Sequence, residues 1–176
     1  MRRLLKAGML VTMLISANTV KAGPAGAFKD VPELQALQPY VGVWNVAVAS
    51  GKTPILDGEA TAEWILDGRY VQQTASLTAK GKPGGIKFTT LMTYDPVRKA
   101  YRSWTFLSNG SSSQSDGVWD SKLKTMTWVS HKDESGNTST TKADFSLMGI
   151  EKLSIVVVDP AGKVVTELNS LNMRRK

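Results

Sequence analysis

Cysteine is absent from this sequence, and histidine is almost absent, since His131 is the only one. The lack of cysteine excludes disulfides, zinc fingers, thiol redox chemistry and cysteine nucleophiles, so an ordinary apolar core must stabilise the fold. A single histidine excludes a histidine-rich metal site, and any Ser-His-Asp triad would depend on His131. No nucleophile motif surrounds this residue, and its alternation with Trp128 predicts that it is exposed. No metal or cofactor is therefore predicted.

A long apolar run is also missing. The first apolar stretch, Met9–Ile15, is well short of the roughly 20 residues that a membrane-spanning helix needs. Basic residues precede it and the small-residue sequence Val20-Lys21-Ala22 follows, which is the pattern of a secretory signal peptide. We therefore expect residues 1–22 to direct export to the periplasm or the exterior; a membrane anchor is the less favoured alternative. Residues 23–30 would then be a linker, and residues 31–176 a single domain that is not anchored in a membrane.

The basic excess of the chain does not predict nucleic-acid binding. The formal charge is +7, and removal of Arg2, Arg3, Lys6 and Lys21 with the signal peptide lowers it to +3. The remaining basic residues are scattered among turns and alternating segments and form no continuous stripe. We expect no nucleic-acid partner.

The sequence is rich in short segments in which apolar and polar residues alternate, separated by turns that contain Gly, Pro, Asp and Asn. Asp67-Gly68 predicts a type I′ hairpin turn, and the Ser/Gly-rich residues 109–117 predict a surface loop. The predicted strands are residues 43–49, 57–66, 69–78, 86–94, 100–108, 118–120, 124–131, 140–147, 152–158 and 164–173.

These strands follow one another without the helical crossovers that parallel pairing needs, so the sheet should be antiparallel. Closure into a barrel removes the two exposed edges of such a long meander. The sequence therefore predicts an all-β, antiparallel up-and-down barrel of about ten strands, with a two-sheet sandwich as the alternative.

The segment before the first strand is apolar and turn-like. Residues 31–37 predict one or two helical turns that plug one end of the barrel, and Pro39 ends them. Gly42 allows the backbone to bend, and Trp44 begins the first strand, so both residues are given structural roles.

Gly42-Val43-Trp44 resembles the G-x-W signature of the calycins, which include the lipocalins and the fatty-acid-binding-like barrels. That resemblance implies that Trp44 lies at the closed end of the barrel, with Arg174 or Arg175 packed over it. The segments 63–70 and 92–95 also resemble those of an uncharacterised family of exported, lipocalin-like bacterial proteins. Since one fold supports many activities, neither resemblance specifies a function.

The tryptophans lie in separate predicted strands, and a barrel would bring them around one interior. We expect an exported protein that binds a small, mainly apolar and, through Arg102, anionic ligand there. Arg102 alternates with Trp104 and Phe106, so all three would face the interior together, and Tyr70 or Gln72 would assist the arginine. The predicted ligand-binding residues are Trp64, Tyr70, Gln72, Met92, Arg102, Trp104, Phe106 and Trp128.

Three alternatives remain open from the sequence. The barrel could be filled with side chains and act as an envelope interaction module through its loops. Arg102 could extend to water at the barrel mouth instead of binding an anion. An enzyme acting on small acids could use Arg102, Tyr70 and Glu63, although no catalytic motif supports it.

Overall fold

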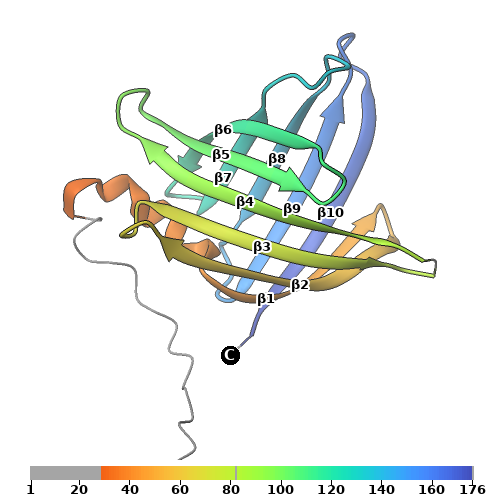
Figure 1. Ribbon diagram of the computed structural model, residues 1–176, viewed down its shortest axis with the longest axis horizontal. Helices are drawn as coiled ribbons and strands as arrows, with labels where there is room; N and C mark the ends of the chain where they lie inside the picture. The colour runs from red at the N-terminus through yellow and green to blue at the C-terminus, as the bar shows by residue number, and fades with distance from the viewer. Residues whose placement is uncertain (1–28, 82, 176) are drawn as a thin grey trace, which may run out of the picture.

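The computed structural model describes residues 29–81 and 83–175 of the chain. The predicted signal peptide, residues 1–22, and most of the predicted linker, residues 23–28, lie outside this range. The described residues form one 3-10 helix, η1, and ten strands that close into a barrel (Figure 1). The predicted all-β antiparallel barrel is confirmed, and the sandwich alternative is excluded.

Apart from β6, the elements lie within a few residues of their predicted bounds. The helix η1 spans Pro32–Tyr40. The strands are β1 (Gly42–Ser50), β2 (Thr53–Ile65), β3 (Tyr70–Ala79), β4 (Gly85–Asp95), β5 (Ala100–Leu107), β6 (Ser112–Asp120), β7 (Thr125–Ser130), β8 (Thr138–Asp144), β9 (Ile150–Val158) and β10 (Val164–Arg174).

Each strand pairs in antiparallel fashion with the strands before and after it in the chain. The first and last strands also pair with each other, from Trp44 opposite Arg174 to Ala49 opposite Asn169, and this pairing closes the barrel. Closure leaves no strand with a free row of backbone donors and acceptors, which is why a meander of this length favours it.

Strand β6 occupies most of the segment predicted as a loop, so that prediction is wrong for residues 112–117. Its serines and Gly117 are poor strand formers by composition, but pairing with β5 and β7 determines their conformation. Gly117 also has a packing role, because a Cβ atom there would lie 2.5 Å from the ring of Trp128. The β2–β3 turn also differs slightly, since its central residues Leu66 and Asp67, both with positive φ, lie one residue earlier than predicted.

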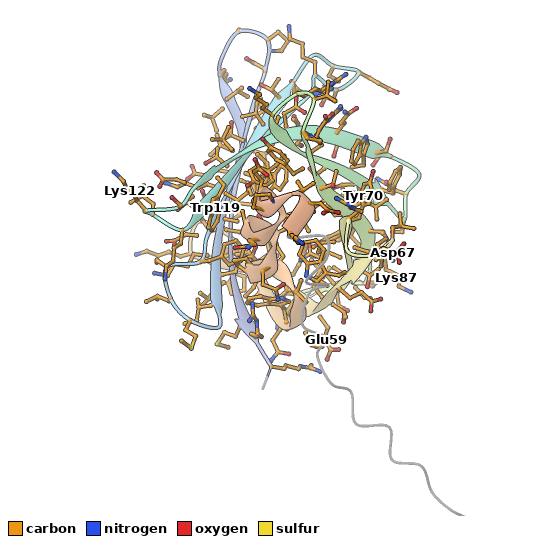
Figure 2. The ribbon with its side chains drawn as sticks, turned by 90° about the vertical axis from the view of Figure 1, so that its left-hand side faces the viewer. Glu59, Asp67, Tyr70, Lys87, Trp119 and Lys122 are labelled. Carbon is orange, nitrogen blue, oxygen red and sulfur yellow. The ribbon has the colours of Figure 1, made fainter. Side chains whose placement is uncertain are left out.

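The helix η1 lies across one end of the barrel, where the strands surround it (Figure 2). Its buried side chains are Leu34, Ala36, Leu37 and Tyr40. These point into the barrel and close that end, as the sequence predicted, although the helix continues through Pro39. No helix in the described part of the chain is long and apolar enough to cross a membrane.

The calycin-like signature has the structural role that the resemblance implies. Trp44 is 2% exposed, and its indole Nε1 donates a hydrogen bond to the carbonyl oxygen of Tyr40 at 2.8 Å. The guanidinium carbon of Arg174 lies 4.7 Å from the centroid of the Trp44 ring, so Arg174 is the arginine that packs over this tryptophan. Gly42 has a φ of 140°, and a Cβ atom at this position would lie 3.3 Å from Arg174 Nε. The glycine therefore leaves room for the arginine side chain.

The barrel interior as a candidate binding site

The strand register shows which side chains face the interior, because directly paired residues share a face of the sheet. Val71 has no exposed surface and pairs with Met92, which pairs in turn with Ser103. The same face continues from Ser103 to Ser115 and Ser130. Along each strand, every second residue from these positions therefore points into the barrel.

The half of the interior next to η1 is filled with side chains. Met126 and Ala143 have no exposed surface, and Met92 is also buried. Hydrogen bonds connect this layer to the helix: Trp128 Nε1 donates to the hydroxyl oxygen of Tyr40 at 2.9 Å, and the Tyr101 hydroxyl donates to the carbonyl oxygen of Glu33 at 2.9 Å. The helix and the strand residues beneath it thus form a solid floor.

The other half of the interior is less completely filled, and a hollow of about 460 Å³ at its end is lined in part by the inward-facing Ser113, Ser130, Ser139 and Val157. In β9 the inward-facing residues Leu153, Ile155 and Val157 are only partly buried. On β6 and β10, the inward-facing Ser113 and Thr166 are exposed. The accessible surface of these inward-facing side chains shows that solvent reaches the interior here. This space opens at the end opposite η1, where the exposed inward-facing residues lie.

The two sides of this space differ in chemistry. Strands β5 to β8 contribute six hydroxyl side chains, and we call this group the hydroxyl wall: Thr105, Ser113, Ser115, Ser130, Ser139 and Thr141. The facing strands contribute mainly aliphatic and aromatic side chains that are partly buried, which we call the apolar wall: Leu56, Ile86, Phe88, Leu153, Ile155, Val157 and Leu168. A ligand in this space would meet hydrogen-bonding groups on one side and apolar surface on the other.

A buried carboxyl group lies near the floor of the space. Glu151 is 2% exposed, and its Oε2 accepts a hydrogen bond from Asn172 Nδ2 at 2.7 Å. Ser170 Oγ lies 2.5 Å from Asn172 Oδ1 and 3.0 Å from the carbonyl oxygen of Ala47, so two acceptors share one hydroxyl proton. Since Ser170 is partly exposed, these hydrogen bonds connect the buried carboxyl to a hydroxyl group that borders the space.

The environment of Glu151 favours its neutral form. Burial raises the pKa of this carboxyl to about 7, while the hydrogen bond from Asn172 and the positive charge of Arg174 oppose that shift. Burial and the nearby charge of Glu151 also raise the pKa of the Tyr40 hydroxyl well above its ordinary value, against the effect of the Trp128 hydrogen bond. Among the described residues, Glu151 and Arg174 are the charged side chains on the inward face, and Arg174 lies at the closed end.

The structure contradicts the predicted position of Arg102, Trp104 and Phe106. Trp104 pairs with Leu91 and Arg102 with Thr93, on the face opposite to Met92. All three predicted ligand-binding residues therefore lie on the outside of the barrel. The face of β5 that does point inward carries Tyr101, Ser103 and Thr105, and it is the more polar face of the strand.

Arg102 is compensated where it lies. Its side chain is 11% exposed, and its Nη1 is 3.9 Å from Asp95 Oδ2. Its Nε is 3.3 Å from Asp116 Oδ1, without hydrogen-bond geometry, and its guanidinium carbon lies 5.2 Å from the Trp104 ring centroid. Two carboxylates and an aromatic face stabilise this charge, so Arg102 does not need an anionic ligand.

Tyr70 and Gln72 are also on the outer face, because they alternate with the inward-facing Val71. Tyr70, Arg102 and Trp104 do come together, but they do so at a hollow of about 360 Å³ outside the barrel beside η1. Glu63, the predicted third member of an enzyme site, is exposed on the outside of β2. The predicted acid/base group is therefore not assembled in the interior.

The remaining predicted residues, Trp64, Met92 and Trp128, do face the interior. They belong to its filled half, where Trp64 Nε1 donates to Gln38 Oε1 of η1 at 2.8 Å. They support the floor of the space, and a ligand-binding role for them stays a prediction.

His131 is exposed, as predicted, and its Nε2 lies 3.2 Å from Asp116 Oδ2. No group of three or more potential metal ligands occurs among the residues that the structure describes.

The sequence interpretation missed Glu151 and its partners because residues 148–151 were assigned to a turn. The alternation that places Leu153, Ile155 and Val157 on one face extends back to Glu151, so a longer strand would have included it. Nothing in the sequence indicates that Asn172, opposite it in β10, would be its hydrogen-bond donor.

Comparisons with known proteins agree with this fold. The sequence model of DUF1579, described as a protein of unknown function, matches residues 30–152. The structure is similar to the S-type phycobiliprotein lyase CPES from Guillardia theta, with a TM-score of 0.58 and 8% identity over 81% of this chain and 92% of that one. A fluorescence-activating β-barrel designed de novo gives a TM-score of 0.41 and 12% identity over 80% of this chain and 97% of that one, which is too low to support an argument. No curated protein matches the sequence.

Proposed function

This chain belongs to the DUF1579 family, for which no function is described, and from the geometry of its interior we propose that it binds a small, mainly apolar ligand inside the barrel. The observation that carries the proposal is the difference between the two halves of the interior. Met92, Met126 and Ala143 next to η1 are buried, whereas Leu153, Ile155 and Val157 are partly exposed and Ser113 and Thr166 are exposed at the other end, where a hollow of about 460 Å³ lies. Export of the protein, which the sequence of residues 1–22 indicates, stays a prediction.

The two walls of the space indicate the chemistry of the ligand. The apolar wall favours a ligand that gains free energy by leaving water, at roughly 25 cal/mol for each Å² of apolar surface buried. The hydroxyl wall favours polar substituents along one edge, because serine and threonine hydroxyls both donate and accept hydrogen bonds. A flat or elongated molecule with one polar edge satisfies both conditions.

The proposed ligand is uncharged or carries a hydrogen-bond donor, not the anionic group that the sequence predicted. Arg102, on which that expectation depended, lies outside the barrel. Glu151, near the floor of the space, would repel an anion whenever it is ionised. The likeness to a phycobiliprotein lyase supports the fold alone.

A dye titration with two matched variants tests the proposal. Thr141 is partly buried and faces the space, whereas the neighbouring Thr140 is exposed on the outside of β8. Thr141→Trp should obstruct the space and weaken the binding of Nile red, an uncharged apolar dye, by about tenfold or more. Thr140→Trp should bind the dye as the unaltered protein does.

Dye emission gives the affinity, and circular dichroism with a thermal melt shows that both variants are folded. The proposal is wrong if the unaltered protein does not bind the dye. It is also wrong if the two folded variants bind equally well, because the dye would then occupy another surface.

A further inference from the structure

The turns at the η1 end of the barrel share a feature that the binding site does not explain. Four hairpin connections meet at this end, and each presents an apolar side chain to solvent. These residues are Leu66 (66% exposed), Val97 (90%), Leu123 (60%) and Met148 (100%), and we call them the apolar tips. Because β2–β3, β4–β5, β6–β7 and β8–β9 are alternate connections of an up-and-down barrel, the tips form a ring around η1.

The opposite end of the barrel has no such ring. Among the described residues of its turns, none is a large exposed apolar side chain, and the nearest ones, Phe106, Val164 and Val165, belong to the strands β5 and β10. If the apolar tips were only the surface residues that any small barrel has, both ends would be expected to carry them. Their restriction to one end indicates a surface that interacts with something apolar.

Basic side chains accompany the tips. The β4–β5 turn carries Arg98 and Lys99 beside Val97, and the β6–β7 turn carries Lys122 and Lys124 beside Leu123. In Figure 2, Lys122 and Asp67 lie on opposite sides of η1, which shows how widely the turns are spaced around this end.

The acidic residues of the same two turns are directed toward the backbone. Asp95 Oδ1 accepts hydrogen bonds from the amides of Val97 and Arg98, and Asp120 Oδ1 accepts them from Lys122 and Leu123. These carboxylates are therefore held at the base of each turn. Arg98 Nε lies 3.8 Å from Asp95 Oδ2, but Lys99, Lys122 and Lys124 have no carboxylate within ion-pair distance among the described residues, so each of these two turns carries a net positive charge.

A hollow of about 550 Å³ lies between two of the turns. The aromatic side chains of Trp119 and Phe145 line it, together with the basic side chains of Lys124 and Arg174. Apolar surface next to two cations matches a molecule that carries an anionic head beside hydrocarbon.

From these observations we propose that the η1 end of the barrel docks onto the surface of an anionic lipid membrane. The apolar tips would enter the boundary between head groups and acyl chains, and the basic side chains beside them would bind the lipid phosphates. The barrel would then stand on its closed end, with the open end of the interior directed away from the lipid. This inference is independent of the ligand that the interior binds.

Sedimentation with lipid vesicles tests the proposal. The chain from residue 23 onward is used, because the apolar residues 9–15 would themselves bind lipid, and it retains every described element of the barrel. It should sediment with vesicles of phosphatidylcholine and phosphatidylglycerol, less with phosphatidylcholine alone, and less again as salt is added. The triple variant Val97→Thr, Leu123→Thr, Met148→Thr should bind the mixed vesicles about tenfold or more weakly.

A matched triple variant, Val118→Thr, Val129→Thr, Leu171→Thr, replaces exposed apolar residues on the strands and should bind as the unaltered chain does. Orientation is read from an environment-sensitive fluorophore on a single introduced cysteine, which is straightforward in a chain without cysteine. The emission at Met148→Cys should shift to the blue on mixed vesicles, and the emission at Ala161→Cys, at the opposite end, should not.

Absence of binding to mixed vesicles overturns the proposal. So does equal loss of binding in the two triple variants, or an equal shift of the two fluorophores. If the chain instead forms a dimer that the apolar-tip variant dissociates, the ring is an interface between copies and the membrane proposal is wrong.

Discussion

Glu151 is the residue with the most unusual environment in this barrel. A carboxyl group at 2% exposure is costly to ionise, and here one amide donor, Asn172, and the more distant Arg174 offset only part of that cost. The result is a group that changes charge near neutral pH at the floor of the candidate binding space. Binding of a ligand and the stability of the fold should therefore both depend on pH.

The stability of the protein should fall as the pH rises through neutrality. The pKa of Glu151 is raised from 4.5 in the unfolded chain to about 7 in the folded one, so the folded state holds a proton that the unfolded state releases. Its contribution is fully present below pH 4.5 and is lost as the pH rises toward and past 7. The shift corresponds to roughly 3 kcal/mol in the free energy of unfolding.

Chemical denaturation of the unaltered protein and of Glu151→Gln, at pH 5 and pH 8, measures this effect. The variant should lose less free energy of unfolding between the two pH values than the unaltered protein does. Glu63→Gln, which alters an exposed carboxylate, is the control and should keep the full loss. An equal loss in all three proteins would show that Glu151 is not the group responsible.

At the scale of single elements, η1 determines which half of the interior is filled. Its apolar side chains occupy the barrel end, and its backbone carbonyls accept hydrogen bonds from Trp44 and Tyr101. Leu37 has no exposed surface, whereas Gln35 in the same helix is exposed. The helix is therefore attached to the barrel by one face.

Removal of the buried side chain should destabilise the whole fold. Leu37→Ala leaves a cavity beneath η1 and should cost about 2–5 kcal/mol in the free energy of unfolding. Gln35→Ala changes the same helix on its exposed side and should cost less than about 0.5 kcal/mol. Thermal melts of the two variants check this, and similar melting temperatures would mean that η1 is not part of the cooperative core.

The strands and the helix could be predicted from the sequence because alternation and turn residues are local signals. Which face of β5 turns inward could not be predicted, although the residues were assigned correctly to its two faces. Trp104 and Phe106 form its more apolar face, and burial of apolar surface alone would direct them inward. The structure places them outside, where Arg102 stacks on Trp104, and directs Ser103 and Thr105 into the barrel.

The whole molecule combines a solid floor next to η1 with a hollow at the opposite end of the barrel. Closure through the pairing of β1 with β10 fixes the wall, and η1 closes one end. Residues far apart in the sequence then face one another across the interior, so the hydroxyl and apolar walls exist only in the closed barrel. No local pattern in the sequence could indicate them, because each strand contributes only a few of their members.

The reactivity of single cysteines placed along β8 tests most directly whether the upper half of the interior is open. Thr140 faces outward, Thr141 faces the space, and Ala143 faces the filled half with no exposed surface. With each residue changed in turn to cysteine, alkylation by N-ethylmaleimide is followed by mass. An open interior predicts that Thr141→Cys reacts within about tenfold of the rate of Thr140→Cys, while Ala143→Cys stays unreacted. If Thr141→Cys reacts as slowly as Ala143→Cys, the interior is filled and the proposed binding site does not exist.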